Sequence, residues 1–165
     1  MKTSVAAVVV VYNEYQSLIE LTQSLSCQVD SIIIIDNSDD GYKVPKVVLN
    51  LPSVKYRRLA FNKGLGVGLN EGITLSKQTG AEWVLLLDQD SVVSNGMVVS
   101  MLAEYHKKSD LTAIAMICPA VFLSDKGMHQ KPWPFIHVLA RKITTPSDEV
   151  ELYSQLESMI NIYCF

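Results

Sequence analysis

The apolar run of residues 83–87 passes directly into Asp88, Gln89 and Asp90, and this junction constrains the fold more than any other stretch. A continuous apolar run of this length, bounded by polar residues, is typical of a strand that is buried on both faces. Such strands belong to parallel α/β sheets, whose ligands bind just beyond the carboxyl ends of the strands. The junction therefore predicts an α/β fold with polar residues gathered at one sheet edge.

Two readings of Asp88 and Asp90 are open from this stretch alone. In an extended chain the two carboxylates would point to the same side, with Gln89 opposite. Two carboxylates at such a short separation repel each other by about 3 kcal/mol at an effective dielectric of about 20. A divalent cation between them replaces this repulsion with attraction. Mg²⁺ and Mn²⁺ favour one or two carboxylates together with phosphate oxygens, which predicts a metal–diphosphate site. The alternative is a polar turn or helix cap after the strand.

The rest of the chain alternates strand and helix patterns. The predicted strands cover residues 5–11, 32–35, a less buried 54–60, 83–87 and an interrupted 113–123, and the predicted helices cover 14–26, a stretch that ends near 79–80 and one capped by Ser94. β-branched runs support the strands, and apolar residues at helical spacing support the helices. This alternation predicts a mostly parallel sheet with helices on both faces. Beyond residue 124 the patterns are weaker and predict a strand over 135–143, a helix over 147–158 and a strand over 160–165.

Composition narrows the function classes. The chain has 165 residues, 48% of them hydrophobic and 19% charged, with a net charge of −3, which is typical of a soluble globular protein rather than a disordered one. The weakly acidic balance argues against nucleic acid as a partner. The three cysteines have no metal-binding spacing and are expected to be buried free thiols of a reducing compartment. No apolar run approaches the roughly 20 residues of a membrane span, so we expect a cytoplasmic protein.

Polar residues that could bind a ligand follow three of the predicted strands. The first strand is followed by Tyr12, Asn13 and Glu14, the second by residues 36–38, and the fourth by residues 88–91. An Asp after the second strand can accept hydrogen bonds from a ribose or a base. The glycine-rich segment, residues 62–72, offers backbone N–H groups and a helix N-terminus, which suit phosphate. Its Gly-x-Gly-x-Gly spacing after the third strand matches neither the dinucleotide fingerprint nor a P-loop, which disfavours NAD-linked and P-loop enzymes.

Four of these segments together resemble a known family. The matching pieces are residues 8–13, 34–38, 62–73 and 83–91, which occur in the same order as in family 2 glycosyltransferases. The chain resembles the N-terminal half of that family, closest to its rhamnosyltransferase-like branch, and residues 87–91 resemble the branch's form of the DxD motif. The resemblance implies the GT-A fold, a Rossmann-like, mostly parallel α/β sheet with helices on both faces, C-terminally truncated here.

The resemblance also implies roles for the strand-end residues. Asp36 would bind the base or ribose, against the alternative of a turn-capping Asp. Tyr12 and Asn13 would form a wall of the base pocket, against the alternative of strand-end packing, and Glu14 would belong to the same nucleotide-sugar site. Asp88 would contact the ribose or the donor sugar, with Gln89 beside it. Asp90, with Asp88, would hold Mn²⁺ or Mg²⁺ on the diphosphate.

Residues of the glycine-rich segment would complete the donor site. Asn62 and Asn70 would lie beside the nucleotide or support the loop. Lys63 would neutralise phosphate, against the alternative of a solvated lysine. Gly64 would serve the backbone geometry of the loop.

The implied reaction is an inverting transfer of a sugar, rhamnose being one candidate, from a dTDP- or UDP-linked donor to a saccharide acceptor. Residues 1–123 would form the nucleotide-sugar-binding core, and residues 124–165 would begin the acceptor-side region. Family members carry a Ser-Gly pair and then an acidic segment that supplies the base. Residues 160–165 lack that pair, so we expect the base beyond Phe165 and little transfer by this chain alone. We also expect peripheral association with the inner face of a membrane and self-association through uncovered sheet edge.

Three other functions make different demands on the same residues. A sugar-phosphate nucleotidyltransferase would need a glycine-rich basic loop after the first strand, where this chain has Tyr12, Asn13 and Glu14. A receiver-like signalling module would need an acidic pair at that position and a lysine after the fifth strand. An inactive nucleotide-sugar-binding remnant is compatible with all the motifs.

Overall fold

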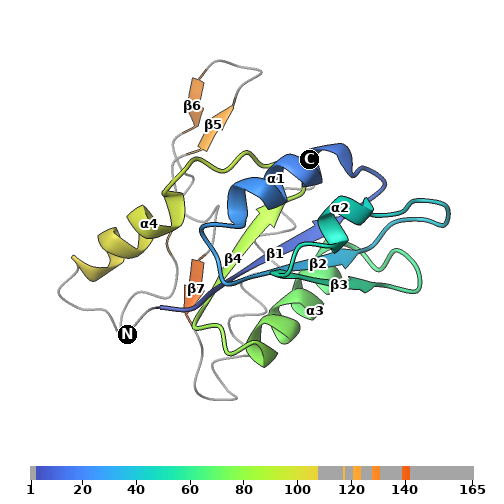
Figure 1. Cartoon of the computed structure of the whole chain (residues 1–165), viewed down its shortest axis with the longest axis horizontal. Helices are drawn as coiled ribbons and strands as arrows, with labels where there is room; N and C mark the ends of the chain where they lie inside the picture. Colours follow the sequence, from blue (N-terminus) through green and yellow to red (C-terminus); the bar gives the residue numbers. More distant parts are fainter. Residues whose placement is uncertain (1–2, 108–116, 118–120, 124–127, 131–138, 142–165) are drawn as a thin grey trace.

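The structure is a computed structural model that describes residues 3–107, 117, 121–123, 128–130 and 139–141 (Figure 1). Its described strands are β1 (Val5–Val11), β2 (Ser31–Asp36), β3 (Val54–Arg58), β4 (Trp83–Asp88), β5 (Val121–Leu123), β6 (Met128–Gln130) and β7 (Leu139–Arg141). Its described helices are α1 (Gln16–Leu25), α2 (Lys46–Leu49), α3 (Leu65–Gln78) and α4 (Met97–His106).

The main sheet has the strand order β3-β2-β1-β4-β7. The pairs β1–β2, β1–β4 and β2–β3 are parallel, whereas β7 pairs antiparallel with β4. Strands β5 and β6 form a separate antiparallel pair. The predicted mostly parallel α/β sheet is therefore confirmed, and its β7 strand comes from the segment predicted to begin the acceptor-side region.

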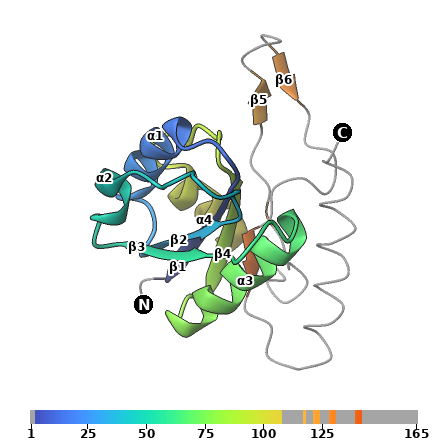
Figure 2. The same cartoon turned by 90° about the vertical axis from the view of Figure 1, so that its right-hand side faces the viewer.

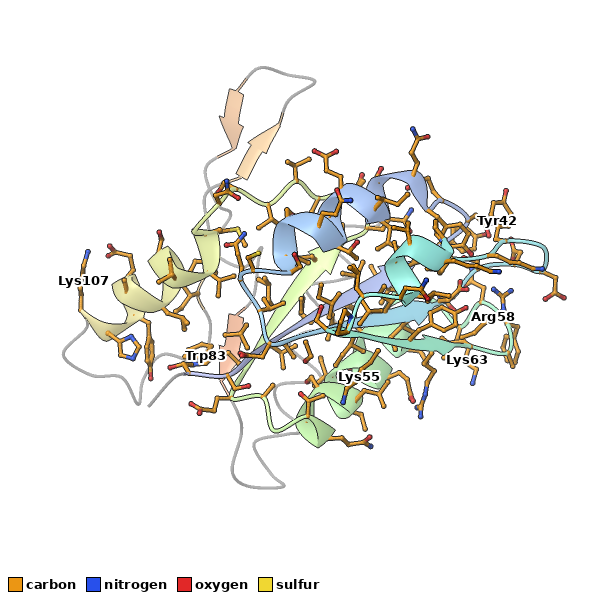
Figure 3. The ribbon with its side chains drawn as sticks, in the orientation of Figure 1. Tyr42, Lys55, Arg58, Lys63, Trp83 and Lys107 are labelled. Atoms are coloured by element: carbon orange, nitrogen blue, oxygen red, sulfur yellow. The ribbon has the colours of Figure 1, made fainter. Side chains whose placement is uncertain are left out.

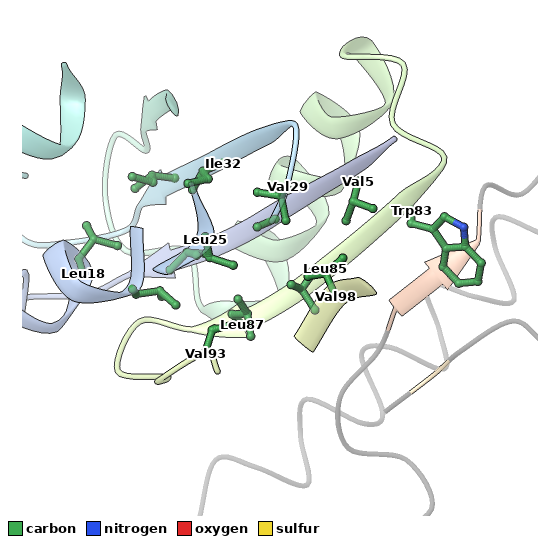
Figure 4. Close-up of a cluster of buried hydrophobic side chains, with 14 of the residues drawn as sticks. Val5, Leu18, Leu25, Val29, Ile32, Trp83, Leu85, Leu87, Val93 and Val98 are labelled. Atoms are coloured by element: carbon green, nitrogen blue, oxygen red, sulfur yellow. The ribbon is translucent and has the colours of Figure 1, made fainter. Parts of the chain in front are cut away.

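Strand β1 occupies the centre of the sheet, and all seven of its residues are buried. Alternate side chains point into two separate apolar cores, because successive residues of a strand face opposite sides of the sheet. One core lies beneath α1, α2 and α4 (Figure 4), and the other lies beneath α3. Figure 2 shows α3 on the opposite face of the sheet from α1 and α2, so the predicted placement of helices on both faces is confirmed.

Helix α3 lies unusually close to β1 because two glycines face the strand. A Cβ atom added at Gly68 would lie 2.8 Å from a methyl group of Val10, and one added at Gly72 would lie 2.2 Å from a methyl group of Val8. Both distances are below normal van der Waals contact, so only glycine fits at this separation. The helix ends where expected, with Gly80 at a φ of 77°, a left-handed conformation that glycine adopts without strain.

Two details differ from the sequence-based expectations. The residue that caps helix α4 is Gly96, whose φ is 76°, and not the predicted cap Ser94. The Ser94 carbonyl accepts the Met97 N–H at 3.2 Å, so that residue contributes its backbone and not a side-chain cap. Cys27 is free as expected, but it is exposed and not buried.

Several expectations fall outside the described residues. These are the environments of the other two cysteines, most of the strand expected over 113–123, the helix expected over 147–158 and the strand expected over 160–165. Within the described part of the chain, no helix is both long enough and apolar enough to span a membrane.

The close approach of α3 to β1 makes a stability prediction. We expect Gly72→Ala to lower the free energy of unfolding, because overpacking a core costs about 1–3 kcal/mol. That cost exceeds the gain of about 1 kcal/mol from replacing glycine with alanine within a helix. The matched control is Gly66→Ala in the same helix, where an added Cβ meets no atom within 4 Å. Urea unfolding of both variants measures the difference, and an unchanged or raised midpoint for Gly72→Ala would contradict the packing argument.

Candidate functional site

The carboxyl edge of the sheet has a switch point between β1 and β4. From β1 the chain adds β2 and then β3 on one side, and later adds β4 on the other side. Ligands of open α/β sheets bind in the crevice at such a point, because the two connections leave in opposite directions. The predicted residues Tyr12 and Asn13 follow β1 here, and Gln89 and Asp90 follow β4.

Gln89 joins the tips of β1 and β4. Its side-chain Oε1 accepts the Tyr12 N–H at 2.7 Å, and its Nε2 donates to the Tyr12 carbonyl at 3.3 Å. The primary amide thereby extends the hydrogen-bond ladder of the sheet by one step beyond the strands. Sequence reasoning placed Gln89 in the nucleotide-sugar site, which stays a prediction, but it missed this structural role.

The chain turns immediately after β4. The Ser91 N–H donates to the Asp88 carbonyl at 3.1 Å, which closes a turn around residues 89 and 90. The extended geometry that would align Asp88 and Asp90 is therefore not what the chain adopts, and the polar turn anticipated as the alternative is present. Both carboxylates are exposed at the carboxyl edge of the sheet between β1 and β4, which we call the rim. The turn therefore does not remove them from solvent or from a ligand.

The loop after β1 is hydrogen-bonded to the loop after β2. Asn13 has a φ of 52°, a left-handed conformation that Asn tolerates better than most residues. Its backbone N–H donates to Ser38 Oγ at 3.0 Å, its Nδ2 donates to Asp39 Oδ2 at 2.8 Å, and its Oδ1 accepts the Asp39 N–H at 3.0 Å. The Tyr12 hydroxyl donates to the same Asp39 oxygen at 3.1 Å. Hydrogen bonds to the loop after β2 thus hold Tyr12 and Asn13, the two residues predicted to form a wall of the base pocket.

Asp36 is completely buried at the end of β2, where protein groups surround its carboxylate. Its Oδ2 accepts hydrogen bonds from the Tyr56 hydroxyl at 2.7 Å and from Arg58 Nη1 at 2.8 Å. Its Oδ1 accepts the Ser38 N–H at 3.0 Å and, more weakly, the Tyr15 hydroxyl at 3.4 Å. The turn-capping role considered for Asp36 is present in the structure, whereas contact with a base or ribose stays a prediction.

The electrostatics of this cluster keep Asp36 ionised. Burial by itself raises the pKa of the carboxyl, but hydrogen bonds from Ser38 and Tyr56 and the charge of Arg58 outweigh it, so the pKa lies below its ordinary value. Burial and the hydrogen bond to Asp36 raise the pKa of Tyr56 to about 12. Tyr56 therefore remains a hydrogen-bond donor at neutral pH, and the carboxylate remains its acceptor.

Asp36 and Asp88 reach the same sheet edge from opposite faces. Ile34 of β2 belongs to the core beneath α1, so strand alternation puts Asp36 on that face, in agreement with its contact to Tyr15 of the α1 entry. Leu86 of β4 packs against the core beneath α3, so Asp88 lies on the α3 face. β1 and the loop that follows it lie between these two carboxylates.

Asn37 fastens the glycine-rich loop to the end of β2. Its buried side chain donates from Nδ2 to Asn62 Oδ1 at 2.9 Å and to the Gly64 carbonyl at 3.1 Å, and its Oδ1 accepts the Lys63 N–H at 2.8 Å. Asn62 Oδ1 also accepts the Gly64 N–H at 2.8 Å. The loop-supporting alternative for Asn62 is therefore present, and Asn37, which the sequence marked only as part of a motif, organises this corner.

The glycine-rich loop delivers the N-terminus of α3 to the same rim. Gly64 precedes the helix with a φ of 83°, a backbone conformation that favours glycine. This agrees with the role in loop geometry that was predicted for Gly64. The Lys63 ammonium lies 5.3 Å from the centre of the Phe61 ring, a cation–π distance, so the exposed side chain is not fully solvated. Asn70 lies further along α3 and is half-buried.

Glu14 has a structural role that sequence reasoning did not foresee. Its Oε1 accepts hydrogen bonds from the N–H groups of Gln16 and Ser17, the latter at 3.2 Å, and so caps the N-terminus of α1. Its Oε2 is buried without a hydrogen-bond partner among the described residues. Membership of the nucleotide-sugar site stays a prediction for Glu14, as it does for Asn70.

The described residues contain no group of three or more His, Cys, Asp or Glu side chains that could hold a metal ion by themselves. A magnesium or manganese ion commonly takes only one or two carboxylates and completes its coordination with water and substrate phosphate. The exposed carboxylates of Asp88 and Asp90 at the rim fit that donor set. The metal role of the two residues stays a prediction.

The cluster around Asp36 predicts the effect of removing one donor. We expect Tyr56→Phe to lower the free energy of unfolding by about 1 kcal/mol, since a hydrogen bond to a charged group contributes about 1.5–3 kcal/mol when buried and Tyr56 is 40% exposed. We also expect the pKa of Asp36 to rise, which carboxyl NMR titration measures. The control is Tyr12→Phe, whose hydroxyl bonds the exposed Asp39. An Asp36 titration unchanged in Tyr56→Phe would count against the cluster.

The lowered pKa of Asp36 fixes the direction of the pH dependence. Because its pKa is lower in the folded state, its contribution to stability is full above about pH 4 and is lost as the pH falls further. We expect the acid-induced loss of stability to be smaller in Asp36→Asn than in the wild type. Asp40→Asn, which alters an exposed neighbouring carboxylate, serves as the control. Equal acid sensitivity in Asp36→Asn and the wild type, measured by denaturant midpoints, would refute this.

Comparison with known proteins connects this geometry to a family. The dTDP-rhamnosyl transferase RfbF of Shigella flexneri is 26% identical over 133 residues, which are 80% of this chain and 43% of RfbF. The chain thus spans less than half the length of this curated relative. The crystal structure of S. aureus TarS superposes with a TM-score of 0.50 and 23% identity, over 63% of this chain and 20% of TarS.

A shorter form of TarS, residues 1–349 in complex with UDP-GlcNAc, gives a TM-score of 0.51 at 23% identity, over 63% of this chain and 32% of that chain. At this identity the likeness establishes a shared fold, the Rossmann-like GT-A fold. The family model described as glycosyl transferase family 2 matches residues 6–158 of the chain. Because that match covers most of its length, the chain belongs to glycosyl transferase family 2.

Proposed function

We propose that the chain binds a nucleoside-diphosphate sugar at the rim between β1 and β4 and takes part in transferring the sugar to a saccharide acceptor. The observation that carries the proposal is the convergence of three strand-end loops and the α3 N-terminus on one switch point, in a chain of this family. RfbF, the curated relative, is named for transfer of rhamnose from dTDP, which supports a dTDP-linked donor. TarS has been solved with UDP-GlcNAc, so a UDP-linked donor is the second choice.

The proposed binding mode places each part of the donor against a different part of the rim. The base would lie against Tyr12 and Asn13, whose positions the Asp39 hydrogen bonds hold. The ribose would lie near the end of β2 or near Asp88. The diphosphate would face the first turn of α3, where backbone N–H groups and the helix dipole favour negative charge. Lys63, beside that turn, would add a positive charge.

We further propose that Asp90 and Asp88 hold a Mg²⁺ or Mn²⁺ ion on the diphosphate. When bound, such an ion stabilises the negative charge that develops on a departing nucleoside diphosphate. The carboxylates would set its position, and Gln89 would keep the turn that carries Asp90 attached to β1. Transfer with inversion then needs an acceptor hydroxyl on the opposite side of the sugar and a base to take its proton, for which we assign no described residue. The acceptor would be a saccharide of a surface polysaccharide.

The proposal predicts metal-dependent and base-selective nucleotide binding. In calorimetric titrations with dTDP, UDP, GDP and ADP, we expect the two pyrimidine nucleotides to bind more tightly, and Mn²⁺ to strengthen their binding. We expect Asp90→Asn to weaken the Mn²⁺-dependent binding by at least about tenfold, since removing even an outer-sphere partner costs about 10–100-fold in metal affinity.

The matched control is Glu82→Gln, which removes an exposed carboxylate just before the same strand, at the opposite edge of the sheet. It should leave nucleotide binding unchanged. Equal affinity for all four nucleotides with no effect of Mn²⁺, or equal losses in Glu82→Gln and Asp90→Asn, would exclude the proposed site.

A further inference from the structure

Basic and acidic residues are segregated along this chain. The interval 41–70, between Asp40 and Glu71, holds six of the 14 Lys and Arg residues and none of the 17 Asp and Glu residues. It comprises α2, β3, the first part of α3 and their connections. Because β3 is the outermost strand on its side of the sheet and α2 packs against it, a protein of net charge −3 has a positive edge.

The positive charge of this edge comes mainly from lysines. Arg58 is paired with the buried Asp36 and with the exposed Asp40, and Arg57 forms an ion pair with Glu71 of α3. The four lysines of the interval are all exposed; they are Lys43, Lys46, Lys55 and Lys63. Two arginines therefore serve the fold, and the lysines remain to attract an anionic partner.

The same interval exposes most of the large apolar side chains of the described surface. Six of the nine lie within it, namely Tyr42, Val47, Leu49, Tyr56, Phe61 and Val67. The most exposed are Phe61 at 66% and Val47 at 54%. We call the four lysines and these six side chains the β3-edge surface. Scattered single apolar residues need no explanation, but their concentration in one interval of the sequence that contains no acidic residue does.

Figure 3 shows that part of this surface lies at one end of the molecule, with Lys55 further along β3 toward α3. Tyr42, Arg58 and Lys63 lie together there, whereas Trp83 and Lys107 lie at the other end. Lys63 and Phe61 are in contact across 5.3 Å, which places a positive charge and an exposed aromatic ring side by side. The loop that carries both residues leads into α3, so the β3-edge surface borders the rim of the candidate site.

We propose that the β3-edge surface docks the protein on an anionic lipid membrane. Lysines near a membrane that contains anionic lipids are each attracted by about 1 kcal/mol, and their apolar stems lie along the interface while the ammonium groups reach the headgroups. Aromatic and aliphatic side chains between them bury apolar area at the headgroup boundary. Bound in this way, the protein holds the rim of its candidate site close to the lipid headgroups.

The surface fits a lipid membrane better than it fits other partners. In a two-fold dimer through β3, the same patch would meet itself and bring lysines against lysines, and lysines on an edge strand oppose such pairing. Nucleic acid would use the positive charge but leaves aliphatic groups such as Val47, Leu49 and Val67 without a role. A fluid anionic interface satisfies both the charges and the apolar side chains.

The test is co-sedimentation of the protein with vesicles, without nucleotide, so that its outcome is independent of the proposed donor site. Vesicles of phosphatidylcholine alone are compared with vesicles of equal parts phosphatidylcholine and phosphatidylglycerol. The charge variant Lys43→Gln/Lys46→Gln/Lys55→Gln should lower partitioning to the anionic vesicles by about a hundredfold, at about fivefold per lysine. The apolar variant Val47→Ser/Phe61→Ser should also weaken binding, and its loss should persist at high salt, where charge attraction is screened.

The control variant Lys77→Gln/Lys107→Gln changes two exposed lysines outside the β3-edge surface and should bind like the wild type. Thermal unfolding checks that every variant is folded. The proposal is overturned if the protein does not prefer the anionic vesicles, or if the control variant loses as much binding as the charge variant. It is also overturned if a single-stranded polynucleotide displaces the protein from the vesicles at equal phosphate concentration, or if sedimentation velocity shows a dimer that the apolar variant dissociates.

Discussion

The separation between α3 and β1 is the constraint on which the rest of the structure depends. Gly68 and Gly72 let the helix backbone approach Val10 and Val8 more closely than any side chain would allow. That approach fixes where the first turn of α3 meets the carboxyl edge of the sheet. Since β1 is buried on both faces and pairs with β2 and β4, its position also sets the three strand ends that form the rim.

Around that frame, the polar groups of the rim stabilise one another. Asp36 would be costly to bury alone, but four protein donors satisfy its carboxylate, and two of them come from β3. Asn37 then ties the loop before α3 to the end of β2, and Asn13 ties the loop after β1 to the loop after β2. Residues that a motif-based reading assigns to a ligand are thus also the residues that hold the loops in place. A structural role does not exclude a ligand role, because Tyr12, Asp88 and Asp90 of the same loops stay exposed at the carboxyl edge of the sheet.

The parts of this structure that sequence could predict are those recorded in short-range patterns. Uninterrupted apolar runs identified β1, β2 and β4, because burial on both faces leaves no polar positions. Basic residues correctly marked β3 as less buried, since it lies at the sheet edge. The cap of α4 was predicted wrongly, because Ser94 and Gly96 both suit the position before a helix and the local sequence does not distinguish them. The contact of Gly72 with Val8, and the arrival of Tyr56 at Asp36, depend on strand register and helix placement, which no local pattern records.

Gln89 has a consequence for how such chains are compared. Its amide offers one donor and one acceptor in the arrangement of a peptide group, and it makes the pair of hydrogen bonds that a further residue of β4 would make with β1. A carboxylate of the same length would set an acceptor against the Tyr12 carbonyl, and a shorter amide would not span the distance. A motif written as two aspartates with any residue between them therefore leaves out Gln89, the side chain that joins the ends of β1 and β4 by hydrogen bonds.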